Sequence, residues 1–231
     1  MKDQIIKKLQ ELNQKTKEKL FFNFVFSGGY DLIQINHETF QAKPIEIVEA
    51  LIESGVDVNI RAGLQRTPLF EVKSKEVAEI LIQHGADVNA RNSYSETPLF
   101  FAKSKEIAEV LIQAGAEVNT KNDNGKTPLF YVKSEKIVEL LIQHGADVNV
   151  RDNDGNTLLF YVGCKEIAKL LIQHGLDANF KNNKGQTPAE FYRSYGYANL
   201  ADFIIMTFEK EKLNQTLPKS PENLNHSKLH L

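Results

Sequence analysis

The sequence predicts an all-α solenoid of stacked helix–turn–helix units with β-hairpin-like loops between them. The first observation is a 30-residue period, because Thr67-Pro68-Leu69-Phe70 returns at 97–100, at 127–130 and, with Leu158 in place of proline, at 157–160. The second is that the other half of each unit keeps the same phase. A glycine recurs there at the same interval, as Gly55, Gly85, Gly115, Gly145 and Gly175. Such a period is typical of repeats that bury their apolar sides against their neighbours.

Local chemistry predicts two helices in each unit. Pro68 suits the first turn of a short helix, where the missing N–H has no partner in any case. Ser74 is an N-cap residue for a second helix, and Gly85 ends that helix in the left-handed conformation. A turn-rich connection follows, in which Asn124-Gly125 is a strong hairpin signal.

With these features the sequence resembles the ankyrin-repeat family, whose unit is a β-turn plus two helices with a Thr-Pro-Leu-His-x-Ala signature. The resemblance covers about residues 37–205 and includes Gly-Ala-Asp-Val-Asn at 85–89 and 145–149. It implies an ankyrin-repeat stack of about six repeats over residues 37–210, which binds a protein partner on its concave face. The near-identical repeats, rich in Lys, Asn and Ile, are also similar to ankyrin proteins of obligate intracellular bacteria. That likeness implies a cytosolic bacterial protein or an effector delivered into a host cell.

Three departures from the family pattern carry structural expectations. The short stretch 73–75 replaces a longer one between the helices, so we expect a first helix of one to two turns. Phe70 and its equivalents stand where the family has histidine, and we expect apolar packing to replace the hydrogen bond of that histidine. Gln65 and Ser95 replace the hairpin glycine, which predicts a different turn at the first two tips because a positive φ is costly without glycine.

The two ends of the chain do not follow the repeat. In residues 1–36, apolar side chains at helical spacing such as Ile5 and Leu9, followed by a break at 28–29, predict a helical cap over the first repeat. An amphipathic helix on a membrane surface is the alternative. The segment 211–231 is polar, and we expect a disordered tail there.

Composition excludes several classes of protein. The 231 residues carry 28 basic and 30 acidic side chains and a net charge of −2, so no nucleic-acid partner is expected. The single cysteine forms no internal disulfide. No apolar run approaches the roughly 20 residues of a membrane span, and no secretory signal is present. We therefore expect a cytoplasmic protein, unless it is delivered into a host, and a monomer.

The motifs of catalysis and metal binding are incomplete. The P-loop-like 125–127 lacks the first glycine of that motif. His84, His144 and His174 each have an aspartate three residues on, but their spacing favours helix-end roles over a zinc site. Cys164 is interpreted as a small, partly buried side chain, with a mildly reactive thiol as the alternative. The sequence predicts no enzyme, no cofactor and no metal.

The residues left for binding lie at the hairpin tips and directly after each signature phenylalanine. Aromatic residues at the latter position either form an apolar stripe that contacts a partner or fill the groove between neighbouring first helices. We expect a non-catalytic interaction module, or alternatively a regulatory or inhibitory subunit of a partner enzyme. The expected partner-binding residues are Leu64, Arg66, Tyr94, Glu96, Phe101, Tyr131 and Tyr161, with Lys73, Lys103 and Lys133 as a charged border.

Overall fold

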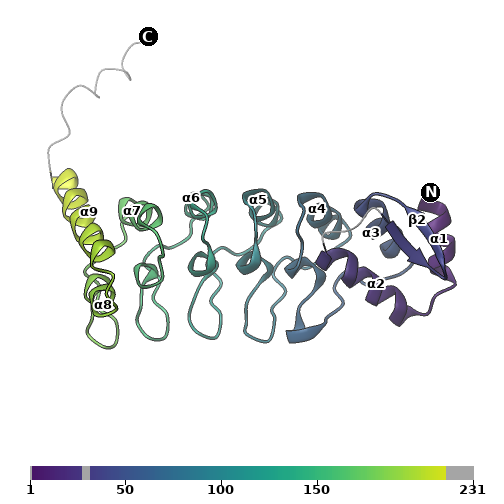
Figure 1. Ribbon diagram of the computed structural model, residues 1–231, viewed down its shortest axis with the longest axis horizontal. Coiled ribbons are helices and arrows are strands. Elements are labelled where there is room, and N and C mark those ends of the chain that lie inside the picture. Colours follow the sequence, from purple (N-terminus) through teal and green to yellow (C-terminus); the bar gives the residue numbers. More distant parts are fainter. Residues whose placement is uncertain (1, 28–31, 217–231) are drawn as a thin grey trace, which may run out of the picture. The chain divides into compact units, whose positions relative to one another are not determined.

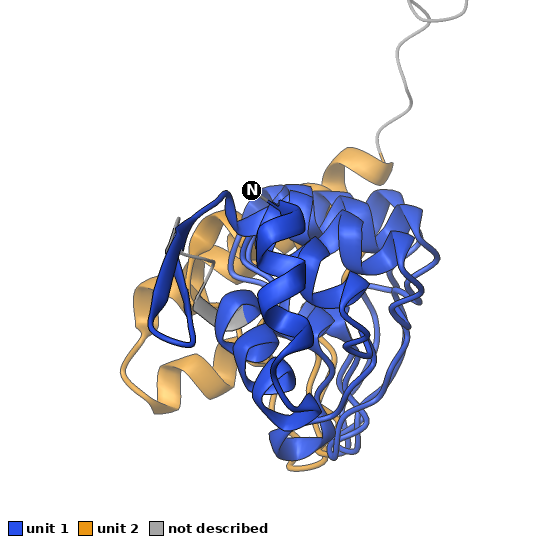
Figure 2. Ribbon diagram, turned by 90° about the vertical axis from the view of Figure 1, so that its right-hand side faces the viewer, with its two compact units in different colours: residues 1–153 blue, residues 154–231 orange. Residues whose placement is uncertain are grey.

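The computed structural model describes residues 2–27 and 32–216 of the chain. The chain forms two compact units, residues 1–153 and 154–231, coloured blue and orange in Figure 2. None of the helices in the described residues is both long enough and apolar enough to cross a membrane.

The first unit repeats one short turn and one α-helix. In the repeats that begin at Thr67, Thr97 and Thr127, a 3-10 turn starts at the predicted proline, and an α-helix of nine residues follows that turn. Figure 1 shows these α-helices side by side, with the loops extending from the same side of each. The turns are η1 (Gly63–Gln65), η2 (Pro68–Phe70), η3 (Pro98–Phe101) and η4 (Pro128–Tyr131), and the helices are α3 (Pro44–Glu53), α4 (Lys75–Gln83), α5 (Lys105–Gln113) and α6 (Glu135–Gln143).

The predicted N-cap bond is confirmed for Ser74 and Ser104, whereas Ser134 at the start of α6 forms no side-chain cap bond. The Ser74 hydroxyl accepts a hydrogen bond from the Val77 amide at 3.3 Å, and Ser104 does the same for Ile107. Gly85 has a φ of +86° directly after the C-cap of α4, which is the left-handed conformation expected at a helix end. The short stretch between the helices leaves a single 3-10 turn where the sequence predicted a helix of one to two turns.

The core lies between neighbouring repeats. Ala78 and Leu81 on α4, and Ala108 and Leu111 on α5, have no exposed surface. Phe70 and Phe100 join this core as predicted, whereas Phe130 is half-buried; Phe70 is 2% exposed and its ring lies 5.7 Å from that of Phe101 in the next repeat. Apolar packing between repeats thus replaces the histidine hydrogen bond.

A repeated asparagine links each repeat to the next. Asn59 donates from Nδ2 to the carbonyl of Gly85 at 2.9 Å and accepts from the Asp87 amide at 2.8 Å. Asn89 makes the equivalent bonds to Gly115 and Glu117, both at 3.0 Å. Each asparagine therefore satisfies backbone groups where the following helix ends, which explains its 30-residue recurrence.

The hairpin tips only partly match expectation. Ser95 has a φ of +61°, and its amide donates to the Asn92 carbonyl at 3.0 Å, as Gly125 does to Asn122 at 2.9 Å. The expectation of a different turn at Ser95 was therefore wrong. Asn92 Oδ1 accepts from the amides of Tyr94 and Glu96, and these two bonds offset the cost of the positive φ. The first tip does differ, because both Leu64 and Gln65 have a positive φ.

The N-terminal segment packs on the first repeat. Helices α1 (Lys2–Gln10) and α2 (Gln14–Ser27) both contact α3. Ile5 and Leu9 have no exposed surface, so the apolar stripe of α1 is used inside the unit and not as a membrane-facing side. Lys2 forms ion pairs with Glu49 at 2.8 Å and Glu53 at 2.7 Å, both on α3.

A β-hairpin stands where the helical cap was predicted to continue. Strands β1 (Leu32–Ile35) and β2 (Glu38–Gln41) pair antiparallel, with Asn36 and His37 at positive φ in the turn. Ile33 and Ile35 are buried while Gln34 is exposed, which is the period of two of a strand. An all-helical cap over 1–36 is therefore wrong for these residues, because so short an apolar run fits a strand as well as a helix. The predicted break at 28–29 lies outside the described residues.

The second unit contains η5 (Leu158–Phe160), α7 (Lys165–Gln173), α8 (Pro188–Ser194) and α9 (Ala198–Thr216). Helix α8 begins with a capping box, in which Thr187 Oγ1 accepts from the Glu190 amide at 3.2 Å and Glu190 Oε2 accepts from the Thr187 amide at 2.8 Å. Helix α9 contacts both α7 and α8. It continues past residue 210 to Thr216, so 211–216 are helical and not a disordered tail, because Glu and Lys are good helix formers. Residues 217–231 lie outside the described residues.

The signature threonines lack the partner that a histidine would provide. The hydroxyls of Thr67, Thr97, Thr127 and Thr157 are buried and have no hydrogen-bond partner among the described residues. Replacing Thr97 with Val removes this buried hydroxyl at nearly constant volume, so we expect the free energy of unfolding to stay equal or rise by up to about 1 kcal/mol. Thr187→Val is the matched control and should lose about 1 kcal/mol, because Thr187 is a working N-cap. Urea unfolding measures the free energy of unfolding of both variants. Equal losses in Thr97→Val and Thr187→Val would show that the Thr97 hydroxyl does have a stabilising partner.

The asparagine link predicts a second stability effect. Asn89→Ala removes both bonds to the next repeat, and we expect a loss of about 1–2 kcal/mol in the free energy of unfolding. Asn89→Asp keeps the acceptor for the Glu117 amide but loses the donor to the Gly115 carbonyl, and should fall between the alanine variant and the wild type. A loss for Asn89→Ala within experimental error of zero would show that packing alone joins the repeats.

Candidate interaction surface

Backbone hydrogen bonds tie the hairpin tips of the first unit into a row. The Ser93 amide donates to the Leu64 carbonyl at 2.8 Å, and the Asp123 amide donates to the Tyr94 carbonyl at 3.1 Å. Each tip is thereby held in register with the tip before it. Side chains carried by the tips stand on a fixed frame and not on freely moving loops.

Three large side chains on this frame are substantially exposed. Leu64 is 48% exposed, Tyr94 is 49% exposed and Tyr131 is 41% exposed. Leu64 and Tyr94 lie at successive tips, where small polar residues are the usual choice. Tyr131 ends η4, the first turn of its repeat. Leu64, Tyr94 and Tyr131 are therefore the expected residues of the first unit that remain available for contact with a partner.

Phe101 and Arg66 pack against each other. The guanidinium carbon of Arg66 lies 4.3 Å from the centroid of the Phe101 ring, and Arg66 Nη1 donates to Glu71 Oε1 at 2.9 Å. Phe101 also contacts Phe70 and is half-buried. At this position the aromatic residue fills the groove between first turns, so Phe101 and Arg66 support the surface more than they project from it.

Glu96 is a buried support and not an exposed contact. It is 7% exposed, and its Oε2 accepts a hydrogen bond from Asn92 Nδ2 at 2.8 Å. The Tyr131 hydroxyl accepts from Asn122 Nδ2 at 2.9 Å, and the Tyr131 ring packs edge-on to Phe100 at 5.4 Å. Burial raises the pKa of the Tyr131 hydroxyl, and the negative charge of Glu96 raises it further. Tyr131 thus fills the groove with one edge and exposes the other.

Tyr161 belongs to the second unit. It is 44% exposed, and its hydroxyl accepts from Asn156 Nδ2 at 3.1 Å. The structure brings the other six expected residues together in the first unit and places Tyr161 in an equivalent position of a separate one.

The asparagines that hold the tips were not predicted from the sequence. Asn92 and Asn122 are both buried, and each accepts two backbone amides with its side-chain oxygen. Their signal was present, since asparagine recurs at 92, 122 and 182 in the same phase as the other repeat positions. Such side chains set the turn geometry on which the exposed residues depend.

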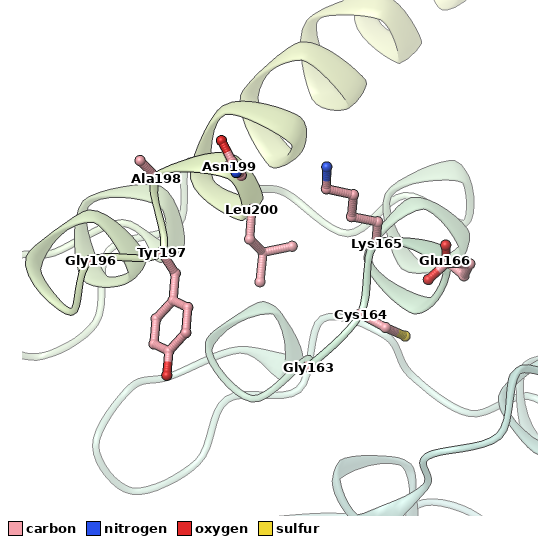
Figure 3. Close-up of a pocket in the computed structure, with 9 residues that line it drawn as sticks. All are labelled: Gly163, Cys164, Lys165, Glu166, Gly196, Tyr197, Ala198, Asn199 and Leu200. Carbon is pink, nitrogen blue, oxygen red and sulfur yellow. The ribbon is translucent and has the colours of Figure 1, made fainter.

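A cavity of about 500 Å³ in the second unit contains Cys164 in its lining. Figure 3 shows that the N-terminal turns of α7 and α9 face it, while the Cys164 thiol points away from Tyr197 and Leu200. The cysteine occupies the N-cap position of α7 and is partly buried, as interpreted from the sequence. The structure gives no geometric support for a reactive thiol directed into this cavity.

His144 and the aspartates proposed for helix ends have structural partners. His144 Nδ1 lies 2.9 Å from the Leu140 carbonyl at the end of α6. Asp87 and Asp147 each accept the amide of the asparagine two residues on, at 2.9 Å. In residues 2–27 and 32–216 no group of three or more His, Cys, Asp or Glu side chains is arranged to hold a metal ion.

A short turn, a helix and an extending loop, repeated every 30 residues, define a helical-repeat protein. The family model of ankyrin repeats in three copies matches residues 37–122, 103–182 and 131–216. These matches cover more than half of the chain, so the chain belongs to the ankyrin-repeat family. Ankyrin repeats are generally protein–protein interaction modules. No curated protein matches the chain. The likeness to proteins of obligate intracellular bacteria stays a prediction.

The contact between Tyr131 and Glu96 predicts a measurable shift. In Glu96→Gln the negative charge is lost while burial persists, so the pKa of Tyr131 should fall yet stay above the ordinary tyrosine value of about 10. An NMR titration of the tyrosine ring carbons measures this pKa. Glu139→Gln makes the same change in charge on the exposed side of α6 and should leave it unchanged. If Tyr131 has the same pKa in Glu96→Gln and in wild type, the charge of Glu96 does not act on the Tyr131 hydroxyl.

Proposed function

We propose that this chain is a non-catalytic interaction protein that holds a partner protein on the hairpin tips and first turns of its repeats. The contacts in the first unit are Leu64, Tyr94 and Tyr131, with Arg66, Glu96 and Phe101 as supports. Tyr161 is an equivalent contact of the second unit. The observation that carries the proposal is the exposure of large apolar side chains at positions that the repeat core does not use.

The rigidity of these positions favours binding. A side chain that is fixed before association loses little conformational entropy when a partner covers it. The tips of Leu64 and Tyr94 are tied by backbone bonds, and Tyr131 is held by both its ring and its hydroxyl. Tyrosine is also among the residues that most often dominate binding energy at protein interfaces.

The test begins with affinity capture by the full chain and identification of the captured protein by mass spectrometry. The purified partner is then titrated into wild type and into the variant Leu64→Ala, Tyr94→Ala, Tyr131→Ala by calorimetry. We expect the affinity to fall about 100-fold or more, because each large anchor contributes about 1–2 kcal/mol.

A matched control exists in the second unit. Tyr195 and Tyr197 are 67% and 62% exposed, more than any of the three proposed contacts. Their double alanine variant removes as much exposed aromatic surface and should change the affinity less than about threefold. The assignment of the surface is wrong if the control variant loses as much affinity as the triple variant.

A further inference from the structure

Three lysines recur directly after the first turns of the repeats. Lys73, Lys103 and Lys133 occupy the same position in consecutive repeats of the first unit, and all three are exposed. Each lies two residues beyond the position of Glu71, Phe101 and Tyr131, so the two Cα atoms are within about 7 Å. Within residues 2–27 and 32–216 none of the three lysines forms an ion pair.

Three acidic groups of the same repeats have other partners. Glu71 is paired with Arg66 at 2.9 Å. Glu79 lies 3.4 Å from Lys75. Glu106 accepts hydrogen bonds from its own backbone amide and from Ser104, and these bonds lower the pKa of its carboxyl. The three lysines are therefore exposed positive groups, and Glu71, Glu79 and Glu106 already have other partners.

The spacing of the row restricts what can neutralise it. Packed helices stand about 8–10 Å apart, and the lysines repeat with α4, α5 and α6. A polyproline-II segment rises about 3.1 Å per residue and returns to the same side every third residue, a distance of about 9 Å. Carboxylates at every third residue of such a segment match one lysine per repeat.

We propose that the partner segment on the first unit is an extended acidic peptide with an Asp or Glu at every third position and apolar residues between. The carboxylates pair with Lys73, Lys103 and Lys133, and the apolar side chains contact Leu64, Tyr94 and Tyr131. This inference rests on the proposed function and adds the chemistry of the partner. The exposed apolar side chains of Leu64, Tyr94 and Tyr131 on the same unit favour a polypeptide over a nucleic acid, whose phosphates need only cations.

The probe is a displayed library of random 15-residue peptides, selected on the full chain. Enriched peptides are synthesised and their affinities measured by fluorescence polarisation at low and high salt. We expect acidic residues at intervals of three, apolar residues between them, and an affinity that falls about tenfold or more at 0.5 M salt because exposed pairs are screened.

Two charge-reversal variants decide the role of the row. Lys73→Glu, Lys103→Glu, Lys133→Glu should weaken binding of the enriched peptides about tenfold or more. Lys15→Glu, Lys19→Glu, Lys210→Glu changes the net charge equally at other exposed lysines and should change it less than threefold. Circular dichroism confirms that each variant is folded, and the single change Lys103→Glu, expected to weaken binding at least twofold, replaces the triple variant if that one unfolds.

The outcomes separate this inference from the proposed function. Enriched peptides without acidic residues, or with equal affinity for the lysine-reversed variant, overturn the acidic partner, while the proposed function stands if the triple alanine variant still loses them. Peptides that bind both variants as tightly as wild type overturn both proposals, and no enrichment at all overturns the extended acidic peptide alone. A 20-nucleotide oligothymidylate that binds wild type and not the lysine-reversed variant would identify the row as a nucleic-acid site and also overturn the inference.

Discussion

The structure depends on the fact that the second helix of a repeat is apolar on more sides than its own repeat can cover. Ala78 and Leu81 of α4 are fully buried because α3 lies on one side and α5 on the other. A repeat of this kind is stable only between neighbours, so any end of a stack must be covered by something different. Helices α1 and α2 provide that cover for α3, and their sequence follows no repeat because they have a different surface to match.

The short first turns and the phenylalanine of the signature are structurally linked. A single 3-10 turn offers few apolar positions, and Phe70 supplies in one side chain the buried area that a longer helix would distribute. The cost is the orphaned hydroxyl of Thr67, which the family's histidine would satisfy. Thr187 shows the alternative, because a glutamate three residues on allows a full capping box and a true α-helix.

The elements that follow from local chemistry could be predicted from the sequence, and those that follow from tertiary contacts could not. Ser74 and Gly85 indicate where a helix begins and ends through interactions within a few residues, so the helix of each repeat could be predicted. The positive φ of Ser95 was not, because it depends on a buried asparagine side chain that accepts two amides. The burial of Glu96 was hidden for the same reason, since a charged residue at a turn is usually solvated.

This difference explains why the exposed and supporting residues of the surface had to be separated by structure. The position before each signature threonine holds Arg66, Glu96 or Lys126. Because this position varies between repeats, the sequence suggests that its side chain is free to contact a partner. Arg66 and Glu96 instead interact with local partners. Arg66 packs on the Phe101 ring, and Glu96 is hydrogen-bonded to Asn92 and acts on the Tyr131 hydroxyl. A partner can gain little from a buried charge that is already hydrogen-bonded, because breaking that bond costs about what a new one returns. Specificity must therefore come from side chains that the repeats leave uncommitted.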